Sequence, residues 1–190
     1  MKNQTRILGI DDSPFKFEDE DSLVVGALVR APNYLEAVMR TRAKVDGMDS
    51  TDRLIELVHG SRYKAQIKAV MIDGIALAGF NVIDVERLYE STSVPVLTVT
   101  RDQPDFKEIE SALKKHFTDW KDRLGLMTRL DMKQIRTEHK PLFACGVGLD
   151  WLDFEELARQ TTVRGSLPEP LRIAHLISSA LVLGESRGRA

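Results

Sequence analysis

The sequence has little cysteine and no long apolar run. Its single cysteine, Cys145, excludes an internal disulfide and a zinc site built from several thiolates. Cys145 stands beside Gly146 in an apolar stretch, which is typical of a small buried residue rather than a nucleophile. The longest apolar runs are far shorter than a membrane span, and no apolar signal-like segment follows the first residues. We therefore expect a cytoplasmic protein that does not enter a membrane.

The chain also lacks an excess of charge of one sign. Its 27 Lys and Arg stand against 29 Asp and Glu, which gives a formal net charge of −2. The protein as a whole therefore does not attract nucleic acid, and such binding would need a local basic patch and metal ions. With 190 residues, no low-complexity tract and no long linker, we expect residues 1–190 to form a single domain.

The spacing of apolar residues predicts an α/β fold. Strands are expected at 6–11, 22–31, 67–73, 94–100 and 141–147, and helices at 50–60, 82–91, 104–124, 152–161 and 170–183. Residues 34–45 fit a third strand and equally fit the start of a helix. Three strands without helices between them, followed by strands that alternate with helices, indicate an antiparallel meander continued by parallel βα units. This order resembles a ribonuclease H-like mixed sheet flanked by helices.

Two of the expected strands end in a carboxylate. Asp11 ends the first strand, and Asp73, followed by Gly74, ends the strand at 67–73. If the two strands are parallel neighbours, both carboxylates lie at the carboxyl edge of the sheet, where α/β folds bind ligands. Mg²⁺ typically binds one or two carboxylates and keeps several waters. The pair therefore favours a Mg²⁺ or Mn²⁺ site, although strand-end acids can also serve only to cap turns.

A third acid is available before the helix expected at 50–60. Asp46 and Asp49 both precede it, where an acid also satisfies the free backbone N–H groups of a helix start. A metal role and a plain cap are both open for each residue. His175 lies on the last expected helix among apolar neighbours, and a lone histidine there is typical of a core residue.

Four segments, taken in order, resemble endonuclease V, a metal-dependent nuclease of the ribonuclease H-like fold. Its G-[VI]-D-x-S, D-G and P-[TV]-[IL]-x-V-[AT]-[KR] segments are matched at 9–13, 73–74 and 95–101. Its most specific segment, [LI]-P-E-P-x-R-[LI]-A-H, is intact from Leu167 to His175. The chain is most similar to an uncharacterised, largely archaeal family (domain of unknown function 99) that is distantly related to endonuclease V.

The resemblance implies a role for several residues. Asp11 and Asp73 would hold the metal, and His175 would orient or deprotonate the attacking water or help to bind a second ion. Asp12, which points to the opposite face of the strand from Asp11, is expected in the turn beside Ser13. Arg101 stands where the family has a lysine and would neutralise a phosphate.

The sequence departs from endonuclease V at three places. The glutamate of the family's R-E-G-P has no direct match, since the acid-glycine pattern favours Asp46 and the helix register favours Asp49. We place Asp49 with Asp11 and Asp73 as the metal ligands. The P-Y-I-P-G wedge is not recognisable at 31–35, and H-P-R is replaced at 79–81. Tyr34 and Phe80 remain as candidate stacking residues, although burial in the core is the more frequent role of each.

These observations predict a Mg²⁺- or Mn²⁺-dependent phosphodiesterase acting on DNA or RNA. Metal chemistry is better supported than recognition of inosine or any other deaminated base. One alternative is an inactive nucleic-acid-binding or interaction protein of the same fold. A receiver domain of a signalling system is a third possibility, but the β-prone run at 22–31 stands where a receiver needs a helix.

Overall fold

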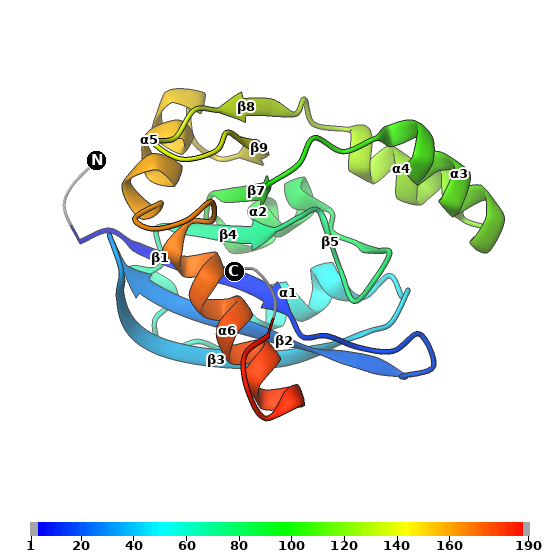
Figure 1. Cartoon of the computed structure of the whole chain (residues 1–190), viewed down its shortest axis with the longest axis horizontal. Helices are drawn as coiled ribbons and strands as arrows, with labels where there is room; N and C mark the ends of the chain where they lie inside the picture. The colour runs from blue at the N-terminus through cyan, green and yellow to red at the C-terminus, as the bar shows by residue number, and fades with distance from the viewer. Residues whose placement is uncertain (1–3, 188–190) are drawn as a thin grey trace.

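The computed structural model describes residues 4–187, and Figure 1 shows their arrangement. Its strands are β1 (Arg6–Asp12), β2 (Asp21–Arg30), β3 (Tyr34–Lys44), β4 (Ala69–Asp73), β5 (Ala76–Leu77), β6 (Asn81–Val82), β7 (Val96–Thr100), β8 (Lys133–Ile135) and β9 (Leu142–Val147). Its helices are α1 (Ser50–His59), α2 (Val85–Thr92), α3 (Phe106–His116), α4 (Trp120–Thr128), α5 (Trp151–Thr161) and α6 (Glu169–Leu183), with a 3-10 turn, η1 (Lys64–Gln66).

Seven strands form one mixed sheet in the order β3-β2-β1-β4-β7-β9-β8. The pairs β1–β2 and β2–β3 are antiparallel, and β4 lies parallel to both β1 and β7. The predicted α/β fold, with its meander and parallel units, is thus confirmed for these five strands. β9 differs because it runs antiparallel to β7 and to β8. The chain reaches β9 from β8 by a hairpin, and a hairpin reverses strand direction where a helical crossover would preserve it.

Three local expectations need correction or completion. Residues 34–45 form a strand, and the exposed alternate positions Arg40, Arg42 and Lys44 give this edge strand the charges that discourage further pairing. The single helix expected at 104–124 is wrong. The chain leaves the helix at Phe117, which is extended, and α4 starts after Asp119. The short hairpin β5–β6 and the strand β8 were not predicted.

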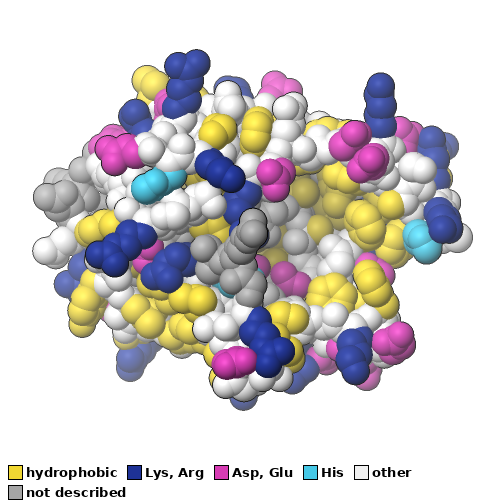
Figure 2. All heavy atoms as spheres, viewed as in Figure 1, with side chains coloured by type: hydrophobic (Ala, Val, Ile, Leu, Met, Phe, Trp, Pro, Cys, Tyr) yellow, Lys and Arg dark blue, Asp and Glu magenta, His cyan; other side chains and the backbone are white. Residues whose placement is uncertain are grey.

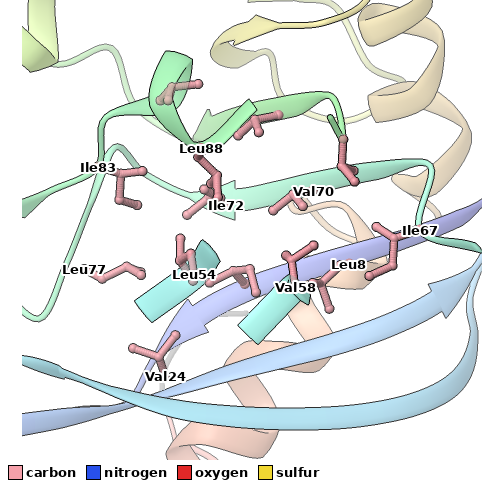
Figure 3. Packing of buried hydrophobic residues seen from close by; sticks show 14 of the residues in the cluster. Leu8, Val24, Leu54, Val58, Ile67, Val70, Ile72, Leu77, Ile83 and Leu88 are labelled. Carbon is pink, nitrogen blue, oxygen red and sulfur yellow. The ribbon is translucent and has the colours of Figure 1, made fainter. Parts of the chain in front are cut away.

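Helices cover both faces of the sheet. On one face, α1 and α2 pack on β1 and β4, and Figure 3 shows Leu54 and Val58 of α1 beside Leu8 and Ile72 of the strands. These four side chains are at most 1% exposed, and each contributes on the order of 1.5–3 kcal/mol by its burial. On the other face lie α5 and α6. No helix within residues 4–187 is long and apolar enough to span a membrane.

Helix α6 crosses β1 and β2 in direct contact with the backbone of β1 (Figure 1). A Cβ atom added at Gly9 would lie 2.2 Å from the backbone carbonyl carbon of Pro170, in the first turn of α6. Leu171 and Ala174 are fully buried against the sheet. The absence of a side chain at Gly9 therefore sets how closely α6 approaches β1.

We predict that Gly9→Ala lowers the free energy of unfolding by about 2–3 kcal/mol, because α6 or β1 must shift to admit the new methyl group. Urea unfolding followed by circular dichroism measures the change. Gly125→Ala in α4 is the matched control, since a Cβ there meets nothing within 4 Å. The control should stabilise the protein by about 0.5–1 kcal/mol through helix propensity. A Gly9→Ala protein as stable as the wild type would contradict the close contact.

Candidate functional site

The first two predicted acids end neighbouring strands at the same level. In the parallel pair of β1 and β4, Ile10 lies opposite Ile72, so Asp11 and Asp73 follow side by side. Across the antiparallel pair, Asp11 lies opposite Val25, whose side chain packs in the cluster with Ala174 of α6. Directly opposite residues share a face of the sheet. Asp11 and Asp73 therefore both face α6 at the carboxyl edge of the parallel strands.

The histidine on α6 reaches this edge. His175 Nδ1 lies 2.9 Å from Asp11 Oδ2, and Asp11 is only 6% exposed. The ring's other nitrogen, Nε2, lies 3.3 Å from the carbonyl oxygen of Arg187. The hydrogen bond that His175 donates to Asp11 raises the pKa of His175. The structure thus brings Asp11, Asp73 and His175 together, although 164 residues separate Asp11 from His175.

Burial makes the negative charge at this edge costly. It raises the pKa of Asp11, and the hydrogen bond from His175 opposes that rise. Burial and the neighbouring charge of Asp11 raise the pKa of Asp73 to about 6. The positive charge of Arg101, just beyond the end of β7, opposes the rise of both pKa values. Two neighbouring carboxylates, one buried and one half-buried, attract a cation more strongly than either does alone.

Asp12 does not lie in the turn beside Ser13, as the sequence led us to expect. Its carboxylate Oδ2 accepts a hydrogen bond of 2.8 Å from the backbone N–H of Ala78, just after β5, while the Ser13 hydroxyl pairs with that of Ser22. Burial, together with the charge of Asp11, raises the pKa of Asp12 to about 7. Asp12 therefore fastens β1 to the β5–β6 hairpin and adds to the charge at the edge.

The two candidates for the third acid are directed elsewhere. The Asp46 carboxylate accepts the backbone N–H of Phe80 at 2.8 Å. The Asp49 carboxylate accepts hydrogen bonds from Asn81 Nδ2, the Lys44 N–H and Arg53 Nε at 2.7, 3.1 and 3.2 Å. Burial acts to raise the pKa of Asp49, but these three bonds outweigh it and the pKa is lowered. Both acids thus hold the hairpin and the start of α1, and the structure does not bring them to Asp11 and Asp73.

The remaining site geometry suits a hard cation with few protein ligands. Within residues 4–187 no group of three or more His, Cys, Asp and Glu side chains is arranged to hold a metal ion. Asp11 and Asp73 nevertheless supply the one or two carboxylates that Mg²⁺ usually takes from a protein, with waters and substrate phosphates completing its shell. Their mutual repulsion at a buried edge fits such an ion.

The two aromatic candidates lie in different places. Tyr34 starts β3 at the turn from β2, and the strand register places it level with Arg30 and Arg6. Arg6 lies five positions before Asp11 on β1, a distance of about 17 Å along the strand. Tyr34 therefore lies at the opposite end of the strands from Asp11, and the guanidinium of Arg30 lies 5.6 Å from the centre of the Tyr34 ring. Phe80, by contrast, lies in the hairpin that Asp12 contacts.

Sequence reasoning missed the residue that joins the hairpin to α4. Arg123 is 5% exposed and donates hydrogen bonds to the carbonyl oxygens of Phe80 and Gly47 at 2.7 and 2.9 Å. It also forms an ion pair with Asp119, the residue that directly precedes α4. The only local signal is the Asp-Arg spacing of four residues, which predicts a surface pair on a helix. Its partners Gly47 and Phe80 are too distant in sequence for any local pattern to reveal them.

Comparisons with known proteins agree with the resemblance seen in the sequence. A family model described as endonuclease dU matches residues 3–182. A UPF0215 protein of Methanothermobacter thermautotrophicus is 44% identical over all of this chain and 94% of its own length. A solved protein of unknown function from Archaeoglobus fulgidus is 35% identical, with a TM-score of 0.84 over 93% of this chain and 98% of that one.

More distant structures share the fold. Endonuclease V of Ciona intestinalis, solved with a DNA that contains an inosine, is 16% identical and has a TM-score of 0.61 over 92% of this chain and 84% of its own. Human endonuclease V has a TM-score of 0.58 over 92% of this chain and 83% of its own at the same identity. The predicted relationship to an uncharacterised archaeal family and, distantly, to endonuclease V is therefore confirmed.

We predict that Asp73→Asn stabilises the protein at pH 8 in the presence of EDTA. The folded-state pKa of about 6 exceeds the ordinary value of 3.8, so the folded protein binds the extra proton and stability falls as pH rises between these values. Removing the charge should recover about 2–3 kcal/mol at pH 8 and almost nothing at pH 3.5. Urea unfolding at both pH values measures this difference.

Asp131→Asn, at an exposed position, is the matched control and should change stability little at either pH. Equal stabilities of wild type and Asp73→Asn at pH 8 would contradict the burial of a repelled carboxylate at this edge.

Proposed function

The chain belongs to the endonuclease dU family, and we propose that it is a metal-dependent endonuclease that cleaves DNA containing deoxyuridine. The observation that carries the proposal is the contact of His175 with Asp11, beside Asp73 at one strand edge. The description of the family supports deoxyuridine as the lesion. The neighbouring endonuclease V structure with inosine-containing DNA supports DNA as the polymer.

We also propose that the fold is of the ribonuclease H-like type. The antiparallel meander of β1, β2 and β3, continued by the parallel strands β4 and β7, supports this type, because the sequence predicted the same succession. A DNA substrate agrees with the predicted cytoplasmic location. The acids at the ends of β1 and β4 then lie where this architecture would bind the scissile phosphate.

Asp11 and Asp73 would hold Mg²⁺ or Mn²⁺, which when bound polarises the phosphoryl group and lowers the pKa of the attacking water. Asp11 also fixes the imidazole of His175 through Nδ1. Nε2 lies 3.3 Å from the Arg187 carbonyl, which can only accept a hydrogen bond, so His175 would take a proton from water at Nε2 once that contact opens. Arg101 would offset the charge of the phosphate, as it already offsets that of Asp11 and Asp73.

A binding protein without catalysis is the second candidate, because the described residues supply no third acid to the metal set. It would bind the same DNA through the same edge. The two candidates differ in one measurable property, which is whether wild-type protein breaks a phosphodiester bond when a divalent ion is present.

We predict that the wild type, with Mg²⁺ or Mn²⁺, cleaves an oligonucleotide containing one deoxyuridine, and that EDTA abolishes cleavage. Asp11→Asn should lower the cleavage rate at least about a hundredfold, since the ion loses a charged ligand. His175→Gln should lower it about 10²–10⁴-fold, the usual contribution of a general base. Gel analysis of end-labelled deoxyuridine, inosine and unmodified DNA and RNA provides the measurement.

Asp131→Asn is the control for a simple loss of negative charge, and it should cleave at the wild-type rate. Asp49→Asn tests the third acid that the sequence favoured, and the geometry leads us to expect that cleavage is retained. No cleavage of any substrate, with wild type and Asp11→Asn alike, would contradict the enzymatic proposal and favour the binding protein.

A further inference from the structure

An apolar pocket opens beside the acidic edge, on the side of the β5–β6 hairpin. Its volume is about 520 Å³, and its lining comes from the β1–β2 loop, the turn before α1, the hairpin and α3. The lining residues are Phe17, Asp46, Phe80, Ala112, His116 and Phe117. Hydrophobic side chains gather in this region of the surface, between α3 and the β1–β2 loop (Figure 2). The pocket thus offers three phenylalanine rings, one imidazole and one carboxylate.

The aromatic rings are only partly used by the fold. Phe80 and Phe117 meet edge to face, with ring centres 5.6 Å apart. Phe17 is 78% exposed at the pocket, and Phe15 is the one aromatic ring within residues 4–187 that it contacts, with ring centres 5.9 Å apart. An exposed phenylalanine that lines an apolar pocket gains free energy when a flat apolar ligand covers it. A nucleobase is such a ligand, and stacking on aromatic rings is the usual way in which proteins hold an unpaired base.

The pocket is braced against collapse. Arg123 holds the carbonyl oxygens of Phe80 and Gly47, and its guanidinium lies 4.2 Å from the ring centre of Phe117. Asp46 accepts the N–H of Phe80 with Oδ1. A Cβ at Gly79 would lie 2.4 Å from the same Oδ1, so only glycine lets the carboxylate come this close. These contacts fix the walls before any ligand arrives, which lowers the cost of binding.

Two hydrogen bonds connect the pocket to the acidic edge. The N–H of Ala78 donates to Asp12 Oδ2, and the carbonyl of Ala78 accepts the N–H of Asp46, each at 2.8 Å. Asp12 directly follows Asp11 at the end of β1. The pocket and the site of Asp11 are therefore neighbours along one edge. A single DNA strand can present a phosphate to the acids while a nearby base enters the pocket.

We propose that this pocket holds the uracil base of an unpaired deoxyuridine, and that Asp46 reads its N3–H group. The inference rests on the proposed function and assigns it a base-binding site. Uracil carries a hydrogen on N3, whereas cytosine carries a lone pair there. A carboxylate oxygen therefore accepts a hydrogen bond from uracil and repels cytosine. Asp46 is thus a specificity residue for the deaminated base rather than the third metal ligand.

Thymine has the same N3–H, so Asp46 does not separate it from uracil. The cost of unpairing separates uracil from thymine in duplex DNA, because a mismatched base leaves the helix more easily than a base in a Watson–Crick pair. Uracil formed by deamination of cytosine stands opposite guanine, whereas thymine is paired with adenine. In duplex DNA the pocket therefore predicts a substrate in which uracil is mismatched.

The test measures binding in EDTA, so that cleavage plays no part. Fluorescence anisotropy of a single-stranded oligonucleotide would compare one central deoxyuridine with deoxycytidine and with N3-methyldeoxyuridine. The wild type should bind the deoxyuridine strand about tenfold more tightly than the deoxycytidine strand or the N3-methyldeoxyuridine strand. A factor of this size corresponds to one hydrogen bond to a charged group. Asp46→Asn keeps an oxygen for the N–H of Phe80 and offers an amide to cytosine. Its preference should fall to about twofold or less.

Two further variants keep the test sharp. Phe80→Leu should weaken binding of all three strands by about tenfold and leave their ratios unchanged, because it removes stacking but not Asp46. Asp153→Asn, at an exposed position on α5, is the matched control and should behave as the wild type. Measured circular dichroism and melting temperature of each variant show whether it is folded.

The possible results separate this inference from the proposed function. If Asp46→Asn keeps the wild-type preference, or slows cleavage without changing base preference, the base-reading role of Asp46 is overturned while a metal-dependent cleavage stands. If Asp46→Asn loses the preference but the wild type never cleaves, the base site is supported and the nuclease proposal fails. Equal binding of all three strands by the wild type would overturn the pocket itself.

Discussion

The contact of α6 with β1 at Gly9 is the constraint on which the site depends. Because Gly9 has no side chain, the first turn of α6 lies directly on the strand. His175, just beyond that contact along the helix, can then reach Asp11 at the strand end. A larger residue at Gly9 would move the helix away and lengthen the hydrogen bond between the two. Packing in the middle of β1 therefore sets the distance between His175 and Asp11 at the end of the strand.

The carboxylates at the same edge lower the stability of the folded protein. Asp11, Asp12 and Asp73 are all buried enough to have raised pKa values, which means that their charged forms destabilise the folded protein near neutral pH. A fold selected for stability alone would place amides or apolar residues at such positions. Carboxylates at these positions suit a cation-binding edge, because a bound ion would relieve the repulsion between them.

Much of the site could be predicted from the sequence. Asp11 and Asp73 are visible because each ends an apolar strand, and His175 because it closes a specific nine-residue segment. The hydrogen-bond partners of Asp46, Asp49 and Asp12 could not be predicted. Each of these side chains bonds to the hairpin at 76–82, which is distant in the sequence.

Local pattern also failed where packing decides the structure. The helical periodicity of 104–124 continues across residue 117, yet Phe117 leaves the helix and its ring packs on Phe80. For Tyr34, a candidate stacking residue, the sequence gives no position relative to Asp11, and the register of β2 and β3 places it at the other end of the strands. A sequence motif specifies neighbours along the chain and not across the sheet.

The alternation of side chains along a β-strand explains why the adjacent residues Asp11 and Asp12 have different partners. Asp11 faces α6 and joins His175, while Asp12 faces the other side and joins the hairpin through Ala78. The hairpin in turn holds Asp46 beside the apolar pocket. One strand end thus connects the face that carries Asp11 and His175 with the face that carries the pocket. A movement of β1 would therefore displace both the proposed metal site and the proposed base site.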